Sequence, residues 1–209
     1  KSVGVYTAGT KSTRVLLTHH RRDLYSNLNG RLIAPVAERD LFEKTHEYWA
    51  GMATKRFHYY TQQSTKILVE PVKVERWVKG GDVVEVEGIR FEVLDTPGFT
   101  RGSVSYLATI DGKRVAFTGD LIYGDGKIFD LYSFQDAIPE ARVGGYHGYA
   151  ARLADLVSSL RKIKSAKPDV IYPARGPIIK NPQEAIDKLI NRVQALYRNY
   201  LSTNALNWY

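Results

Sequence analysis

The sequence predicts a single α/β domain, and three observations support this expectation. The chain has 209 residues and a mass of 23.6 kDa, which suits one hydrophobic core that folds without disulfide or metal support. Short β-rich runs fill most of the first 120 residues, and two amphipathic helical patterns fill the last third. No internal repeat or flexible linker divides the chain, so we expect one domain spanning residues 1–209.

The first part of the chain is expected to be mostly strands. Apolar residues that run continuously or alternate with polar ones predict strands at residues 3–7, 14–18, 32–36 and within 67–78. Two further hairpins are expected with turns at Glu87–Gly88 and Asp111–Gly112, because glycine after an acidic residue tolerates positive φ. Between these strands, apolar residues at helical spacing predict one helix over residues 41–55.

The last third of the chain should contain two helices around one short strand. Leu153, Leu156, Leu160 and Ile163 lie on one helical face, and a strand is expected at residues 170–172. The final helix is predicted over residues 182–202, where a proline in the first turn is followed by a long apolar stripe.

Composition excludes several classes of protein. Apolar runs are far shorter than the roughly 20 residues of a membrane-spanning helix. The chain has no cysteine, which excludes disulfide scaffolds and thiolate metal sites and leaves His, Asp and Glu as strong metal ligands. A formal charge of +8 favours an anionic partner without identifying one. No basic-then-apolar leader follows Lys1, and the cytoplasm is the default expectation for location.

Four polar clusters follow predicted strands, at residues 18–23, 95–100, 118–120 and 173–177. They read Thr-His-His-Arg-Arg-Asp, Asp-Thr-Pro-Gly-Phe-Thr, Thr-Gly-Asp and Pro-Ala-Arg-Gly-Pro. In order and spacing they resemble the motifs of the metallo-β-lactamase superfamily, which run Thr-His-x-His-x-Asp-His, Thr-Pro-Gly-His-Thr, Thr-Gly-Asp and Pro-Gly-His-Gly-Pro. The resemblance covers about residues 14–180.

The resemblance implies an αββα sandwich that holds two zinc ions and hydrolyses esters, thioesters, amides or phosphodiesters. Family members usually have several strands and a helix before the first motif, whereas only 18 residues precede His19 here. We therefore expect a sandwich that is incomplete on its N-terminal side, with a sheet edge covered by a second copy, by a partner chain or by a part of the parent protein outside this sequence.

The family's ligand positions fall on seven residues of this chain: His19, Arg21, Asp23, Leu24, Phe99, Asp120 and Arg175. Only His19, Asp23 and Asp120 can bind a metal, because guanidinium offers no lone pair and leucine and phenylalanine are inert. A normal dinuclear site is therefore not expected, and we expect no cofactor. If the protein is active, Asp23 and Asp120 are the candidate catalytic residues.

The substitutions predict charge compensation, since a cation now stands at positions 21 and 175 beside two carboxylates. We expect Arg21 or Arg175 within ion-pair distance of Asp23 or Asp120. The leading hypothesis is a domain that has lost zinc hydrolase activity and serves a structural or binding role.

Two alternatives stay open at this point. One is a metal-dependent hydrolase of ester, thioester or amide substrates, with one metal held by His19, Asp23 and Asp120 and assisted by His20 or His147. For His20 we favour a packing or surface role, facing away from His19, and for His147 a structural one. The other alternative is a basic subunit associated with nucleic acid, supported only by the +8 charge and by the resemblance, since some members of the superfamily process RNA.

Overall fold

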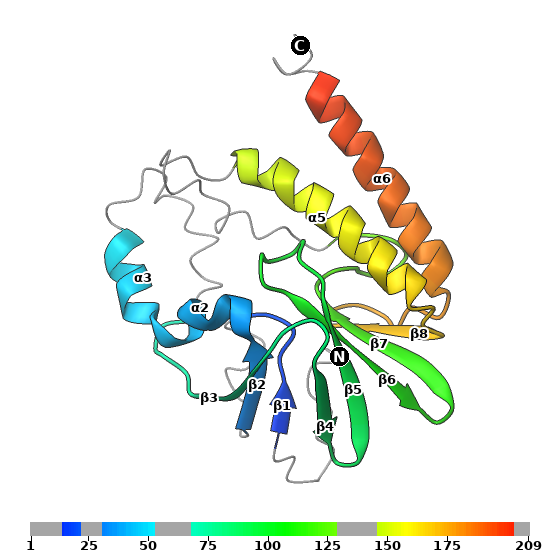
Figure 1. Cartoon of the computed structure of the whole chain (residues 1–209). Coiled ribbons are helices and arrows are strands. Elements are labelled where there is room, and N and C mark those ends of the chain that lie inside the picture. Colours follow the sequence, from blue (N-terminus) through cyan, green and yellow to red (C-terminus); the bar gives the residue numbers. More distant parts are fainter. Residues whose placement is uncertain (1–13, 22–30, 53–67, 129–145, 203–209) are drawn as a thin grey trace.

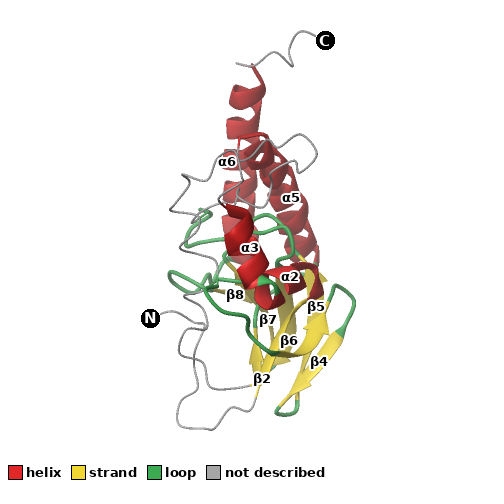
Figure 2. Cartoon of the chain, turned by 90° about the vertical axis from the view of Figure 1, so that its left-hand side faces the viewer, coloured by secondary structure: helices red, strands yellow, loops and turns green. Residues whose placement is uncertain are grey.

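The computed structural model describes residues 14–21, 31–52, 68–128 and 146–202. The expected strand at residues 3–7 lies outside these ranges, as do Asp23 and Leu24. The described residues form two sheets with helices on their outer sides (Figures 1 and 2).

The first sheet has three parallel strands in the order β1-β2-β3. They are β1 (Arg14–Leu16), β2 (Arg31–Pro35) and β3 (Val74–Val78). The second sheet has five strands in sequence order: β4 (Val83–Val86), β5 (Ile89–Asp95), β6 (Val104–Ile110), β7 (Lys113–Gly119) and β8 (Val170–Pro173). Strands β4 to β7 are antiparallel, and β8 runs parallel to β7. The predicted strands of these regions are confirmed, although β3 is shorter than the alternating stretch from residue 67.

Both predicted hairpin turns are confirmed. Glu87 and Gly88 have φ values of 52° and 79°, and Asp111 and Gly112 have values of 50° and 72°. Two central residues with positive φ match the twist of the flanking strands, which is why acidic residue plus glycine is a strong hairpin signal.

The helices differ from the prediction in one place. After the short helix η1 (Val36–Glu38), α2 (Arg39–Glu43) and α3 (Thr45–Met52) replace the single helix expected over residues 41–55. Lys44 leaves the helical region between them, with φ −109° and ψ 39°, and the carbonyl of Phe42 accepts a hydrogen bond from Val72 N–H at 2.9 Å. This tertiary bond takes the place of a helical one, so the prediction of one continuous helix was wrong.

The two C-terminal helices, α5 (Tyr146–Ser165) and α6 (Pro182–Ser202), are confirmed. They cover one face of the five-stranded sheet, and α2 and α3 lie beside the three-stranded sheet (Figures 1 and 2). No helix within the described ranges is long and apolar enough to cross a membrane.

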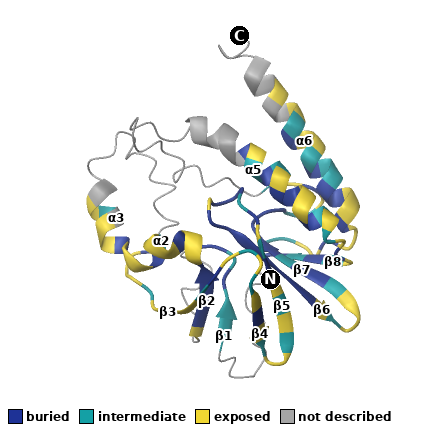
Figure 3. Ribbon diagram, in the orientation of Figure 1, coloured by how far each residue is buried: buried dark blue, intermediate teal, exposed yellow. Residues whose placement is uncertain are grey.

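Alternating side chains on the strands show that the domain has four layers. On β2, Leu32 and Ala34 pack with Phe42 of α2, whereas Ile33 between them packs with Val93 of the opposite sheet. Successive strand residues point to opposite faces, so the three-stranded sheet separates a helix-side core from an inter-sheet core. The four residues from Leu32 to Pro35 are all buried, as expected for a strand that is covered on both faces (Figure 3).

The five-stranded sheet alternates in the same way. Leu107 of β6 packs with Leu160 of α5, while its neighbour Tyr106 lies in the inter-sheet core. The Tyr106 hydroxyl donates a hydrogen bond of 2.8 Å to the carbonyl of Leu17, just after β1, and thereby ties the two sheets together. The order of layers is therefore helix, sheet, sheet, helix, and the predicted αββα arrangement is confirmed.

Candidate functional site

The four polar clusters meet at one end of the two sheets. The rings of His19 and Phe99 lie 4.9 Å apart, His19 Nε2 lies 3.4 Å from Asp120 Oδ2, and Arg175 forms an ion pair with Asp120. These four residues come from four different clusters and follow β1, β5, β7 and β8. The expectation that the clusters converge in one place is therefore confirmed.

Backbone pairing explains how residues far apart in sequence come together. Gly119 of β7 pairs with Pro173 of β8, and Ala174 N–H donates to the Gly119 carbonyl at 2.8 Å. Asp120 and Arg175 are the residues that follow these paired positions. Between the two sheets, Val104 N–H of β6 donates to the Thr18 carbonyl after β1 at 2.8 Å, which fixes the loop that carries His19.

Gly119 is required where the loops approach each other most closely. Its φ is 58°, and a Cβ atom there would lie 2.4 Å from Thr18 Oγ1 and 3.2 Å from His19 Nδ1. A larger residue would push the loop after β1 away from Asp120. The glycine of the Thr-Gly-Asp motif thus sets the distance between His19 and Asp120.

Asp120 is the electrostatic centre of the site. Its Oδ2 atom contacts Arg175 Nη1, His19 Nε2 at 3.4 Å and Arg21 Nη1 at 3.7 Å, and its side chain is 1% exposed. Burial alone would raise the pKa of this carboxyl, but the contacts with His19 and Arg175 outweigh burial and lower the pKa to about 2. The carboxylate is therefore ionised at neutral pH, and the predicted pairing with an arginine is confirmed.

Some buried polar atoms of the site have no hydrogen-bond partner within the described ranges, among them His19 Nε2, Asp120 Oδ1 and Thr118 Oγ1. Arg175 contacts Oδ2, so the second carboxylate oxygen of Asp120 is left without a donor. Buried polar atoms of this kind are uncommon in native structures, where such atoms are usually paired with protein or with ordered water.

The remaining positions of the site are filled by packing. The Phe99 side chain is buried with its ring edge against His19, and the Arg21 guanidinium lies over the Phe99 ring, with Cζ 5.4 Å from the ring centre. This is the geometry of a cation–π contact. An apolar ring and a cation therefore occupy two positions where the motif pattern would place histidines.

A second buried cluster lies beside the first and is centred on Glu38. Its Oε2 accepts hydrogen bonds from His20 N–H and, at 2.8 Å, from His20 Nδ1–H. Its Oε1 accepts from the Thr100 hydroxyl and, at 3.2 Å, from Gly102 N–H. Burial would raise the pKa of Glu38, but the charge and hydrogen bonds of His20 more than offset it, so the pKa is lowered.

Sequence reasoning missed Glu38. It follows β2 in a polar stretch that has no motif spacing, and its partners are 18, 62 and 64 residues away in the chain. His20 does face away from His19, as predicted, and of the two roles considered for it the structure supports packing, because its side chain is fully buried.

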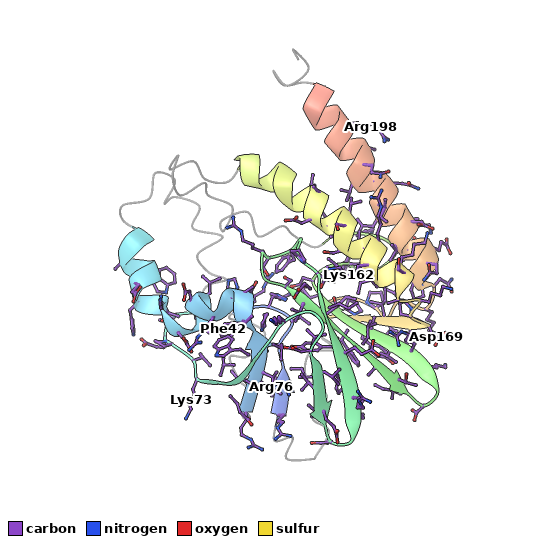
Figure 4. All side chains as sticks on the ribbon, viewed as in Figure 1. Phe42, Lys73, Arg76, Lys162, Asp169 and Arg198 are labelled. Carbon is purple, nitrogen blue, oxygen red and sulfur yellow. The ribbon has the colours of Figure 1, made fainter. Side chains whose placement is uncertain are left out.

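Helix α5 holds the loop after β5 against the site. Ser159 donates a hydrogen bond of 2.6 Å to the Pro97 carbonyl, and Lys162, labelled in Figure 4, donates to the Asp95 carbonyl. Gly98 lies against Leu156, where a Cβ atom would come within 2.9 Å of the helix backbone. These contacts with α5 fix the loop that carries Phe99.

Comparison with known families identifies the fold. The model of the metallo-beta-lactamase superfamily matches residues 27–175. The chain belongs to the metallo-beta-lactamase superfamily. Among solved structures, a superfamily protein of Thermus thermophilus gives a TM-score of 0.62 at 20% identity and covers 91% of this chain and 63% of its own. A subclass B3 metallo-beta-lactamase of Bradyrhizobium japonicum gives a TM-score of 0.55 at 19% identity and covers 94% of this chain and 75% of its own.

Curated relatives of this superfamily domain are named as hydrolases or lactamase-like proteins. A beta-lactamase-like protein 2 homolog of Caenorhabditis elegans is 31% identical over 58% of this chain, and a hydroxyacylglutathione hydrolase of Photobacterium profundum is 35% identical over 41%. An atrochrysone carboxyl ACP thioesterase of Aspergillus fumigatus is 27% identical over 63% of this chain. The matches span 34%, 33% and 35% of the relatives, so the chain covers about a third of their length.

A class B3 metallo-beta-lactamase from a soil metagenome, whose structure is similar to this domain, is a di-zinc enzyme. The described residues of this domain do not fit that metal. Arg175 occupies Oδ2 of Asp120, position 99 carries an apolar ring, and the described ranges contain no group of three His, Cys, Asp or Glu side chains placed to hold a metal. Asp23 and Leu24 lie outside the described residues, and His147 lies on α5 at a position where only the backbone is described.

Proposed function

We propose that this metallo-beta-lactamase domain has lost dinuclear zinc hydrolase activity and serves a structural or binding role. The observation that carries the proposal is the ion pair between Arg175 and Asp120, at the place where the motif pattern would put a histidine and a bridging aspartate. A guanidinium is permanently charged and offers no lone pair, so it cannot ligate a metal.

The loss of hydrolysis follows from what a hydroxide nucleophile needs. A metal ion lowers the pKa of bound water to about 7, and without such a Lewis acid water stays a poor nucleophile at neutral pH. Phe99 and Arg21 supply neither a ligand nor a base here, because one is an apolar ring and the other a cation that packs on it. Asp120 is ionised, but two of the side chains that contact it are the cations Arg175 and Arg21.

A structural role is supported by the density of buried contacts among the motif loops. Asp120 joins the loops after β1, β7 and β8, and Glu38 joins the loop after β1 to η1 and to the loop between β5 and β6. Buried charges that are paired in this way keep the loops in a fixed arrangement, because separating the charges would leave an uncompensated charge in the interior.

A second candidate is a metal-dependent hydrolase with a reduced site. His19 Nε2 and Asp120 Oδ1 lack hydrogen-bond partners within the described ranges, and Asp23 would complete a set of three ligands. The relatives named as a hydroxyacylglutathione hydrolase and a thioesterase make a thioester the first substrate class to test for this candidate.

Metal analysis combined with activity assays separates the two candidates. We expect far less than one equivalent of zinc after purification, and no chelator-sensitive hydrolysis of ester, thioester or β-lactam test substrates. The matched control is a variant with histidine at positions 21, 24, 99 and 175, which should bind zinc if the surrounding loops keep their geometry. One equivalent of zinc in the unmodified protein, with turnover lost in chelator and in His19→Ala, would establish the hydrolase instead.

A further inference from the structure

The position of Arg175 carries an inference that rests on the proposed function and deepens it. We infer that Arg175 is a tethered cation that takes the place of a metal ion at Asp120 and keeps divalent metals out of the site. The lost activity then depends on one side chain that excludes the metal, as well as on the histidines that are missing.

The contacts of a single oxygen atom show how exclusion would work. Asp120 Oδ2 contacts Arg175 Nη1 and lies 3.4 Å from His19 Nε2 and 3.7 Å from Arg21 Nη1. A divalent cation at this oxygen would meet two fixed positive charges within about 4 Å in a poorly solvated interior, where repulsion between like charges is strong. It would also have to break the Arg175 ion pair.

Arg175 is the more important of the two arginines for this role. The Arg21 group lies farther from the carboxylate, and its guanidinium also rests on the Phe99 ring. Arg175 makes the direct ion pair, and its side chain is 18% exposed, whereas Arg21 and Asp120 are 9% and 1% exposed. Removing Arg175 therefore takes away the direct pair and opens a path from solvent to Asp120.

The site keeps two ligand atoms that a metal could use once Arg175 is gone. His19 Nε2 and Asp120 Oδ1 are buried and make no hydrogen bond within the described ranges. His19 and Asp120 are already in contact, since Gly119 sets the spacing of their loops. A histidine at position 175 would add a third ligand beside them.

The test compares four variants by thermal unfolding in chelator and in Co²⁺, with cobalt absorption as a second measurement. For the unmodified protein we expect the same Tm in both conditions. Arg175→Ala should lower Tm in chelator by on the order of 5 to 15 °C, because it removes the direct ion pair of the buried Asp120 carboxylate, and Co²⁺ should restore part of this loss. Arg175→Lys keeps the charge and should not respond to cobalt.

Two further variants keep the test decisive if Arg175→Ala does not fold in chelator. Arg175→His should bind about one equivalent of Co²⁺ and show a visible absorption band. The double variant combines Arg175→Ala with Asp120→Asn. It should be more stable in chelator than Arg175→Ala, and its Tm should not change with cobalt. The inference is overturned if Co²⁺ raises the Tm of the unmodified protein, or if neither Arg175→Ala nor Arg175→His responds to cobalt. That second result would leave the proposed function intact, whereas chelator-sensitive turnover by the unmodified protein would overturn the proposed function itself.

Discussion

His19 and His20 are neighbours in the chain, yet their rings belong to two separate buried clusters. His19 contacts Asp120 at 3.4 Å, and His20 contacts Glu38 at 2.8 Å. Because alternate residues of an extended segment face opposite ways, the loop after β1 joins the strand ends of the five-stranded sheet on one side and η1 on the other. A substitution of Asp120 or of Glu38 should therefore alter the geometry of both clusters.

Replacing Glu38 should destabilise the domain strongly. Glu38→Gln places an amide group where four donors now point at a carboxylate, so we expect a loss of about 3 to 5 kcal/mol in the free energy of unfolding. Urea denaturation at neutral pH measures this loss. Glu43→Gln is the matched control, because it removes an exposed pair with Arg39 and should cost less than about 1 kcal/mol. Equal effects of the two changes would contradict the importance of the Glu38 cluster.

Stability should fall in acid. Despite burial, contacts with His19 and Arg175 lower the pKa of Asp120 from 3.8 to about 2, and His20 lowers that of Glu38. A carboxylate with a lowered folded pKa adds stability above its unfolded pKa and loses it as pH falls through the folded value, so the loss should occur between about pH 5 and pH 2.

For Asp120 alone this contribution is about 2 kcal/mol. Urea denaturation at a series of pH values gives the slope, and Asp120→Asn should make it shallower while lowering stability at neutral pH. Unchanged stability down to about pH 2 would show that the pKa values of these carboxyls are the same in the folded and the unfolded protein.

Gly98 should tolerate no side chain. Its φ is 150°, and a Cβ atom would come within 2.9 Å of Leu156 on α5, so Gly98→Ala should cost about 3 kcal/mol and loosen the loop that carries Phe99. Gly112→Ala is the control, because Gly112 has φ 72° with open space around it and should cost about 1 kcal/mol for its backbone conformation alone. Chemical denaturation compares the two, and a larger loss at Gly112 would count against the close packing of α5.

The hydroxyl of Tyr106 should contribute to the stability of the domain, although the residue lies in an apolar core. Tyr106→Phe leaves the Leu17 carbonyl without its donor and should cost about 1 to 2 kcal/mol. Tyr172→Phe keeps the ring stacked on Phe117 at 5.5 Å and removes a hydroxyl with no hydrogen bond in the described part of the chain, so it should be nearly neutral. Thermal unfolding of both variants measures the difference, and equal Tm values would mean that the bond between the sheets contributes nothing.

Local patterns in the sequence predicted much of the fold. Asp111–Gly112 and Glu87–Gly88 specify their turns through their own backbone preferences, and the apolar stripe of α5 specifies its buried face. The break between α2 and α3 was not predictable in this way, because it depends on a hydrogen bond from Val72, 30 residues after Phe42.

The candidate site, like the fold, was predicted from the sequence only in part. Motif spacing predicted that His19, Asp120 and Arg175 would come together, and charge predicted the ion pair. Glu38 gave no signal, because a single glutamate in a polar segment looks like a solvated surface residue until the fold brings Thr100 and His20 to it. The expected partner chain at the sheet edge stays a prediction.

The covalent attachment of Arg175 changes how this site depends on its surroundings. The stabilisation that a bound ion gives to a protein grows with the free concentration of that ion, so it rises and falls with supply. The guanidinium that pairs with Asp120 is part of the chain, and its local concentration is fixed by the pairing of β7 with β8. The four loops should therefore keep the same arrangement in metal-starved and metal-replete cells.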